Sequence, residues 1–93
     1  MIVSFRSKAL KDYWQKSDAS RLRPDWMPRV TIILDALDAA SKADDLNLPG
    51  MGWHPLKGNL KGRFAVTVSR NWRITYSFAN GDASLLDLED YHG

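Results

Sequence analysis

Cysteine is absent from the 93-residue sequence, and His54 and His92 are its only histidines. The first absence excludes disulfide bonds, thiolate nucleophiles and cysteine-based zinc sites, and two imidazoles offer little for metal catalysis. No apolar run is near the ~20 residues that span a bilayer. The opening stretch becomes charged at Arg6, unlike a signal peptide. We therefore expect a cytoplasmic protein with no membrane segment, no metal and no other cofactor.

Acidic residues are missing from the whole of residues 46–81, where five lysines and arginines lie among aromatic residues. The net charge of the chain is only +2, but residues 1–29 carry +4, residues 30–45 carry −3 and residues 82–93 carry −4. A long segment without acids is typical of a surface that faces a polyanion. A solvated sheet face explains the same composition, so charge alone leaves both interpretations open.

The apolar pattern of the first half predicts a short strand followed by two helices. The strand is IVSF, with Val3 and Phe5 expected on its core side. Ser7 is a suitable N-cap for the first helix. After a polar loop, the second helix begins near Asp25, where Pro28 is tolerated in the first turn. The apolar residues of this second helix recur at helical spacing and are expected in the core: Val30, Ile33, Leu34, Leu37 and Ala40.

From Trp53 onward the apolar residues recur at every second position, which predicts strands. The residues expected to face the core are Phe64, Val66, Val68, Trp72, Ile74, Tyr76 and Phe78. Those expected to face away are Arg63, Ala65, Thr67, Arg73, Thr75 and Ser77. With short strands near WHPLK and in ASLLDLED, the sequence predicts a four-stranded meander in an α+β fold. Both helices then cover one face of the sheet, and the other face stays open.

The NGD sequence predicts a hairpin between the last two strands, and its loop length decides which residues pair. A two-residue loop places Asp87 opposite Ile74 and so buries a carboxylate beside the core. A three-residue loop, which includes Asp82, pairs Ile74 with Leu88 instead, so we prefer it. In that register Glu89 lies on the outward face of the sheet.

A small set of side chains near this outward face is suited to cutting RNA without a metal. The 2′-hydroxyl attacks the adjacent phosphorus when groups are present to take its proton, protonate the departing 5′ oxygen and stabilise the charged oxygens. His92 titrates in the range for proton transfer, and Asp90 can hold it in one tautomer. Lys57 and Arg73 can stabilise the phosphate charge, and Tyr91 can stack on a base.

Further contacts with phosphate are expected from cations of the acid-free segment and of the helices: Lys61, Arg63, Arg70, Lys8, Lys11 and Arg29. Each candidate residue also has an ordinary structural interpretation. A histidine near a chain end is commonly exposed, a strand arginine is commonly a surface charge, and Lys57 fits a turn. His54, which precedes a proline, also fits a structural role. Spacing alone does not decide between these interpretations.

Three motifs in order, HPLKGN, NWRITYSF and NGDASLLDLEDYHG, resemble the HigB toxins of type II toxin–antitoxin pairs in the RelE superfamily. The resemblance covers residues 1–93 as a single RelE-like domain. It implies an N-terminal strand and two helices packed on one face of a mainly antiparallel sheet. It also implies a ribosome-dependent endoribonuclease that cuts mRNA in the ribosomal A site and thereby inhibits translation.

The same resemblance implies roles for particular residues and a set of partners. It places Lys57 and Arg73, together with the tail of Asp90, Tyr91 and His92, at active-site positions. His54 and Asn71 match positions that face the mRNA near that site. The implied partners are the 70S ribosome, mRNA and a HigA-like helix-turn-helix antitoxin. The toxin is expected to reach operator DNA only through this antitoxin.

Two other functions remain open at this stage. A ParE-like toxin shares the fold but inhibits DNA gyrase by binding, without cutting RNA. A non-enzymatic RNA-binding module would keep its binding after the loss of His92. The set of Lys57, Arg73 and the Tyr91–His92 tail favours the nuclease, because a protein that only binds does not need it.

Overall fold

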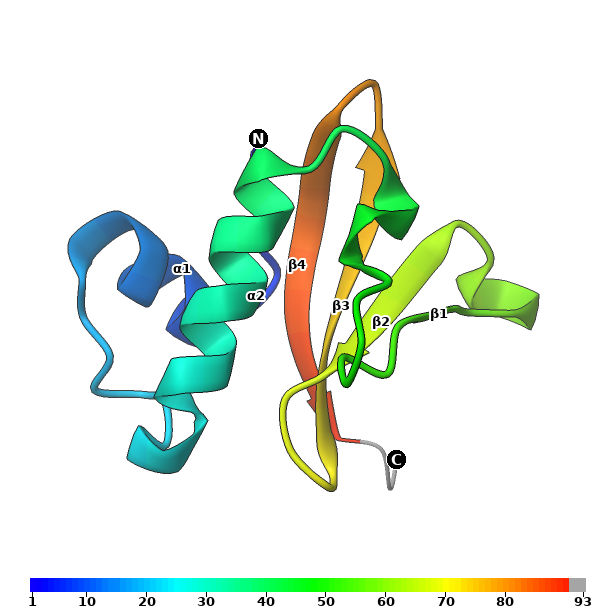
Figure 1. Cartoon of the computed structure of the whole chain (residues 1–93). Coiled ribbons are helices and arrows are strands. Elements are labelled where there is room, and N and C mark those ends of the chain that lie inside the picture. The colour runs from blue at the N-terminus through cyan, green and yellow to red at the C-terminus, as the bar shows by residue number, and fades with distance from the viewer. Residues whose placement is uncertain (91–93) are drawn as a thin grey trace.

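The computed structural model describes residues 1–90 and shows an α+β fold, with two helices beside an antiparallel four-stranded sheet (Figure 1). The helices are α1 (Lys8–Lys16) and α2 (Met27–Ala39). The strands, in sheet order, are β1 (His54–Pro55), β2 (Arg63–Thr67), β3 (Trp72–Ala79) and β4 (Asp82–Asp90). Short 3₁₀ helices lie in the connections: η1 (Pro24–Trp26), η2 (Ala43–Leu46) and η3 (Gly58–Leu60). The predicted α+β fold is confirmed.

Both helices form for the reasons that the sequence supplies. Ser7 Oγ accepts a hydrogen bond from the Leu10 amide at 3.2 Å, which caps the start of α1. Pro28 lies in the first turn of α2, where a missing amide proton does no harm. The predicted core residues of α2 are all buried: Val30, Ile33, Leu34, Leu37 and its C-cap Ala40. Within residues 1–90, no helix has both the length and the apolar character that crossing a membrane requires.

The hairpin between β3 and β4 corrects one prediction and confirms another. Ala79 pairs with Asp82, so the loop has two residues and the preferred three-residue loop is wrong. Ile74 nevertheless pairs with Leu88, as predicted. A β-bulge reconciles the two observations, because Leu85, with a φ of 53°, adds one residue to β4 where the register shifts. The bulge, not the loop, keeps the carboxylates of β4 off the core face.

The predicted N-terminal strand is present only as two isolated parallel bridges to β4, Ile2 with Ala83 and Phe5 with Leu86. Ile2 is buried and Val3 is exposed, so the expectation that Val3 faces the core is wrong. The physical reason is the bulge, which lies between the two bridged positions of β4 and prevents a regular ladder beside it.

Tyr76 connects the inner face of the sheet to two segments that precede the sheet in the sequence, one at Ala43 and one at Trp53. Its side chain is fully buried, and its hydroxyl accepts a hydrogen bond from Trp53 Nε1 at 2.8 Å and donates one to the Ala43 carbonyl at 3.0 Å. Burial raises the pKa of Tyr76, which keeps the hydroxyl protonated. Trp53 also stacks on Phe64, with ring centroids 5.7 Å apart. These contacts fix the residue that precedes His54.

Tyr76→Phe is expected to reduce the free energy of unfolding by about 1–3 kcal/mol, because it leaves two partly buried polar groups without their partner. Tyr13→Phe is the matched control. The hydroxyl of Tyr13 is hydrogen-bonded to Thr31 Oγ1 at 2.8 Å, but Tyr13 is only half-buried, so water can replace the lost contact. Urea denaturation of both variants tests the difference. Equal losses would contradict the account of Tyr76 as the connecting residue.

Candidate active site

A row of three residues crosses the outward face of the sheet near the end where the described chain leaves β4. Thr67, Arg73 and Glu89 lie directly opposite one another on β2, β3 and β4. Residues paired in this way point to the same face, with Cβ atoms about 4.5–5.5 Å apart. The predicted position of Glu89 on the outward face beside Arg73 is therefore confirmed. Both side chains are half-buried, so the sheet limits their freedom without removing them from solvent.

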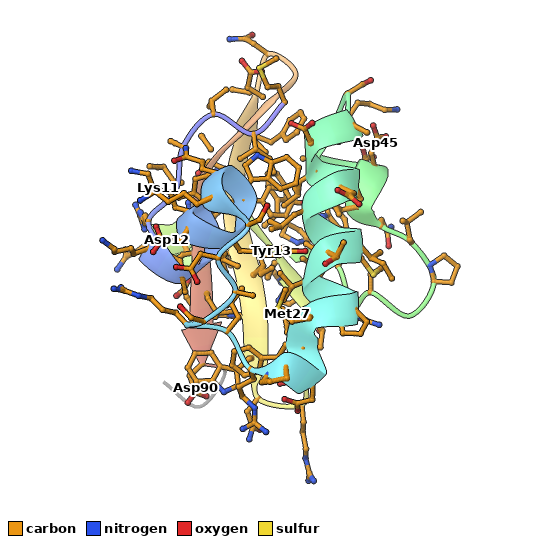
Figure 2. All side chains as sticks on the ribbon, turned by 90° about the vertical axis from the view of Figure 1, so that its left-hand side faces the viewer. Lys11, Asp12, Tyr13, Met27, Asp45 and Asp90 are labelled. Atoms are coloured by element: carbon orange, nitrogen blue, oxygen red, sulfur yellow. The ribbon has the colours of Figure 1, made fainter. Side chains whose placement is uncertain are left out.

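Asp90 is the last residue that the structure describes. It is exposed and pairs with Trp72 at the start of β3, and Figure 2 shows it at the lower end of the sheet. The strand alternation turns Asp90 to the opposite side from Glu89. Tyr91 and His92 lie outside the described residues, so their predicted roles stay predictions.

His54 lies one row further along the outward face. It pairs with Ala65 of β2, which pairs with Thr75 of β3. Its Nδ1 is 3.1 Å from the Gly52 carbonyl oxygen. Since a carbonyl only accepts, Nδ1 carries the proton, and in the neutral ring Nε2 is the acceptor. His54 is half-buried and thus held in place while part of its ring meets solvent.

Lys57 is exposed, but the structure does not place it beside Arg73. The preceding residue, Leu56, donates its amide to the Arg63 carbonyl at 2.8 Å, at the start of β2. Thr67, the partner of Arg73, is four residues further along β2, or about 13 Å at ~3.3 Å per residue. Lys57 therefore lies near the start of β2, and Arg73 lies beside its end on the neighbouring strand. The two residues can contact the same phosphate only if both long side chains extend toward it.

Arg63 is on the outward face, as predicted, but it is not a surface cation. Only 7% of it is exposed, and its guanidinium donates to Ser77 Oγ at 3.0 Å, Thr75 Oγ1 at 2.9 Å and the Leu85 carbonyl at 2.9 Å. Burial lowers the pKa of Arg63, and nearby Arg6 acts in the same direction. The expectation that Arg63 faces a phosphate is wrong, because the side chain is buried and both of its Nη atoms donate to acceptors inside the protein. Thr75 is fully buried as well, so the middle of this face is closed rather than open.

The remaining predicted phosphate contacts divide into exposed and internal residues. Lys61 is exposed beyond η3, and Arg70 and Asn71 are exposed in the turn between β2 and β3, next to the Trp72–Asp90 pair. Arg29 is used internally, because its guanidinium donates to the carbonyls of Thr67, at 2.9 Å, and Gly50. Arg29, which is half-buried, thus holds α2 against the end of β2.

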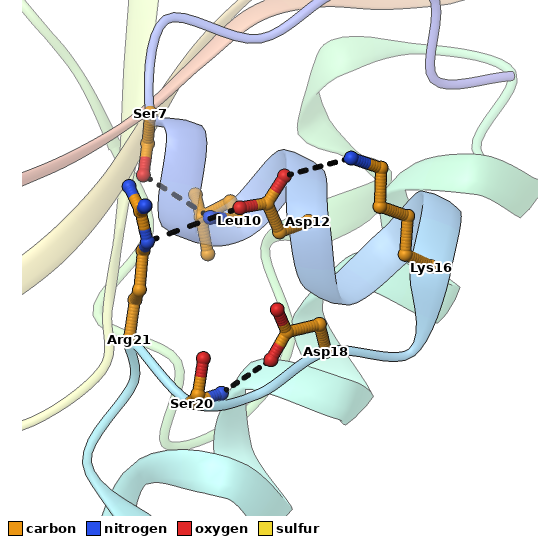
Figure 3. Close-up of polar contacts among 7 residues, drawn as sticks. All are labelled: Ser7, Leu10, Asp12, Lys16, Asp18, Ser20 and Arg21. Carbon is orange, nitrogen blue, oxygen red and sulfur yellow. Dashed lines mark hydrogen bonds and ion pairs between the residues drawn. The ribbon is translucent and has the colours of Figure 1, made fainter.

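A surface cavity of about 290 Å³ beside the start of α1 brings together a basic cluster that sequence analysis did not identify as one site. Its cationic lining residues are Arg6, Lys8, Lys11 and Lys16. Asp12, only 7% exposed, also lines it, and its carboxylate oxygens lie 4.0 Å from Lys16 Nζ and Arg21 Nε (Figure 3). Helical spacing of Lys8, Lys11 and Lys16 was the available signal. Arg6 joins them only because the preceding segment follows β4.

Among residues 1–90, no group of three or more histidine, aspartate or glutamate side chains is placed to hold a metal ion. The candidate site as the structure describes it consists of cations, one imidazole, the carboxylate of Glu89 and the exposed carboxylate of Asp90.

Solved structures of bacterial proteins share this fold. A mutant of YafQ from E. coli matches with a TM-score of 0.64 and 19% identity, over 99% of this chain and 93% of that one. The YoeB dimer from Staphylococcus aureus matches with a TM-score of 0.64 and 17% identity, over 99% and 95%. YoeB is also present in a YoeB–YefM complex from S. aureus, which matches with a TM-score of 0.60 and 16% identity, over 94% and 93%. At these identities the likeness defines the fold alone.

The sequence comparisons define the family. The model of the HigB-like toxins, described as RelE-like toxins of the type II toxin–antitoxin system HigB, matches residues 3–92. A protein from Proteus vulgaris named Endoribonuclease HigB is 42% identical over 99% of this chain and 100% of its own length. Toxin HigB-1 of Vibrio cholerae is 31% identical over 98% of this chain and 100% of its own. The chain belongs to the HigB-like family, which confirms the resemblance seen in the three motifs.

Proposed function

We propose that this HigB-like toxin is an endoribonuclease that cuts mRNA in the A site of the ribosome and so inhibits translation. One observation carries the proposal. Arg73 lies on the outward face opposite Glu89, at the end of the sheet from which the chain continues to Tyr91 and His92, in a protein 42% identical to one named Endoribonuclease HigB. The ParE-like alternative has no comparable support.

The proposed reaction is transfer of the phosphodiester to the neighbouring 2′ oxygen without a metal. The 2′ oxygen forms a bond to phosphorus as its proton passes to a base, and the bond from phosphorus to the 5′ oxygen breaks as that oxygen gains a proton from an acid. The products are a 2′,3′-cyclic phosphate and a 5′-hydroxyl end. Arg73 and Lys57 stabilise charge on the non-bridging oxygens, and His92 transfers a proton. Tyr91 stacks on a base, and Asp90 orients His92.

The other exposed candidates extend the contact with RNA. His54 has Nε2 available as an acceptor, Lys61 is exposed before the start of β2, and Arg70 and Asn71 are exposed in the turn after its end. The basic cavity beside α1 offers a second group of cations for ribosomal phosphates. Because so few groups on this small face position RNA, we propose that ribosomal RNA completes the alignment of the mRNA.

The proposed regulatory partner is a HigA-like antitoxin, a helix-turn-helix protein that connects the toxin to operator DNA. Membership in a toxin–antitoxin family supports a protein partner. The YoeB–YefM complex, in which a protein of this fold is joined to a second protein, supports it as well. A toxin that acts on translating ribosomes, held inactive by such a partner, works in the cytoplasm.

The proposal predicts that the purified protein cuts ribosome-programmed mRNA at least about 100-fold faster than the same mRNA alone, because the ribosome supplies alignment. Cleavage is measured with mRNA placed in the A site and with naked mRNA at equal concentration. Equal rates would contradict ribosome dependence. Growth arrest with inhibited gyrase and intact mRNA would replace the nuclease by the ParE-like function.

A further inference from the structure

A chain of two side-chain hydrogen bonds, one buried and one partly buried, runs across the outward face of the sheet from Arg63 to Glu89. Arg63 Nη2 donates to Thr75 Oγ1 at 2.9 Å, and Thr75 Oγ1 donates to Glu89 Oε2. The first two residues are almost without exposure, at 7% and 0%. Neither of these links belongs to the regular ladder of the sheet, and neither was predicted from the sequence.

The direction of this chain is fixed by the chemistry of its members. A guanidinium only donates hydrogen bonds, so Thr75 Oγ1 must accept from Arg63. The single proton of the hydroxyl is then directed to the remaining neighbour, the Glu89 carboxylate. A hydroxyl that accepts one charge-assisted hydrogen bond and donates a second one has little rotational freedom. Thr75 therefore holds one oxygen of Glu89 in a defined place.

The same guanidinium also holds the bulge that sets the register of β4. Arg63 Nη2 donates to the Leu85 carbonyl at 2.9 Å, and the Leu85 amide donates to Ser4 Oγ at 2.9 Å. Leu85 has a φ of 53°, which is unfavourable for leucine and persists only where the surroundings hold it. A slip of one residue at this point would turn Glu89 to the other face. Arg63 thus affects the position of Glu89 in two ways. It holds the bulge that sets the register of β4, and it orients the Thr75 hydroxyl that bonds the Glu89 carboxylate.

We propose that Arg63, acting through the Thr75 hydroxyl, is a positioning residue that holds the Glu89 carboxylate beside Arg73 on the cutting face. Glu89 is the cross-strand neighbour of Arg73, so the place of its carboxylate restricts where the Arg73 guanidinium points. Neither Arg63 nor Thr75 contacts the RNA. The role of this chain rests on the proposed nuclease function, because it serves the orientation of Arg73 toward the phosphate.

The test compares Thr75→Val, which removes only the hydroxyl at nearly constant shape, with Thr75→Ser, which keeps it. Thr75→Val is expected to lower the single-turnover rate of cleavage at saturating protein about 10- to 100-fold, because the orientation of Arg73 is relaxed. Its affinity for programmed ribosomes should change less than about twofold, and its circular dichroism should show a folded protein at the assay temperature. Thr75→Ser should restore the rate to within about threefold.

Ser77→Ala is the matched control. Ser77 Oγ accepts from the same guanidinium at 3.0 Å but lies outside the path from Arg63 to Glu89, so this variant should cut at the wild-type rate. Equal slowing by Ser77→Ala and Thr75→Val would overturn the proposal in favour of general loosening. A wild-type rate for Thr75→Val would overturn it directly. If Thr75→Val does not fold, Arg63→Lys takes its place and should slow cleavage similarly, because a single ammonium nitrogen cannot reach all the acceptors that the two Nη atoms of the guanidinium serve.

A measurement without RNA separates this inference from the nuclease proposal. The Nε–H resonance of Arg73 in the nuclear magnetic resonance spectrum reports the orientation of its guanidinium. It should shift in Thr75→Val and keep its wild-type position in Thr75→Ser and Ser77→Ala. An unchanged resonance in Thr75→Val would overturn the positioning role even if the wild type cuts mRNA. If the Arg73 resonance shifts in Thr75→Val but the wild-type protein cuts no mRNA, the nuclease proposal is contradicted and the positioning of Arg73 is not.

Discussion

Arg73→Ala is expected to lower the single-turnover rate of mRNA cleavage on the ribosome by about 10²–10³-fold, as the loss of one preorganised donor to a developing oxyanion does. The reason is its place on β3, between Thr67 and Glu89, where the paired strands on both sides fix the backbone. Binding to the programmed ribosome should change little, because the interaction grows mainly as charge develops on the phosphate. Single-turnover cleavage and ribosome pelleting measure the two quantities.

Arg70→Ala provides the comparison for Arg73→Ala. Arg70 is an exposed cation only three positions earlier, in the turn between β2 and β3. Its loss should weaken ribosome binding, more at low salt than at high salt, and leave the rate at saturating protein unchanged. If Arg73→Ala behaves in the same way, Arg73 binds RNA without taking part in the reaction. Arg73→Lys should recover part of the rate, because it keeps the charge but loses the two-pronged geometry.

His92→Ala is expected to slow cleavage by about 10²–10⁴-fold, the usual cost of losing a general acid or base. β4 ends at Asp90, which pairs with Trp72, the residue before Arg73, and His92 is two residues further along the sequence. The variant should bind programmed ribosomes as the wild type does, since proton transfer contributes to the transition state and not to ground-state affinity.

The matched control for His92→Ala is His54→Ala, which removes the other histidine of the chain. His54 is held by its hydrogen bond to the Gly52 carbonyl, and we propose that it contacts RNA, so its loss should affect affinity more than the saturating rate. Wild-type cleavage by His92→Ala would show that the tail histidine has no catalytic part. Proton transfer would then have to be assigned to His54 or Lys57.

The regular elements of the fold were predictable because local rules determine them. The cap at Ser7 follows from side-chain chemistry, and the buried face of α2 follows from helical spacing. The alternation in β3 identified Ile74 and Tyr76 as core residues correctly. The family resemblance then added a prediction that these rules do not give, namely which exposed polar residues form one site.

The features that sequence analysis missed depend on contacts between distant segments. The Asn-Gly loop and the bulge at Leu85 together give the same pairing of Ile74 as a longer loop, so alternation alone cannot distinguish them. Arg63 was expected at the surface because the strand alternation turns it away from the core and because it belongs to the acid-free segment. Its burial depends on acceptors contributed by β3 and by the bulge of β4, which no local pattern of β2 reveals.

The chemical ends of the cut mRNA test the central claim most directly. Programmed ribosomes are incubated with the purified wild-type protein, and the products are compared with those from mRNA that carries a single 2′-O-methyl group at the cut nucleotide. The account predicts a 5′-hydroxyl on the downstream fragment and a 2′,3′-cyclic phosphate on the upstream one, with no cut in the methylated mRNA, because the 2′ oxygen is the nucleophile. A 5′-phosphate on the downstream fragment, or undiminished cutting of the methylated mRNA, would contradict it.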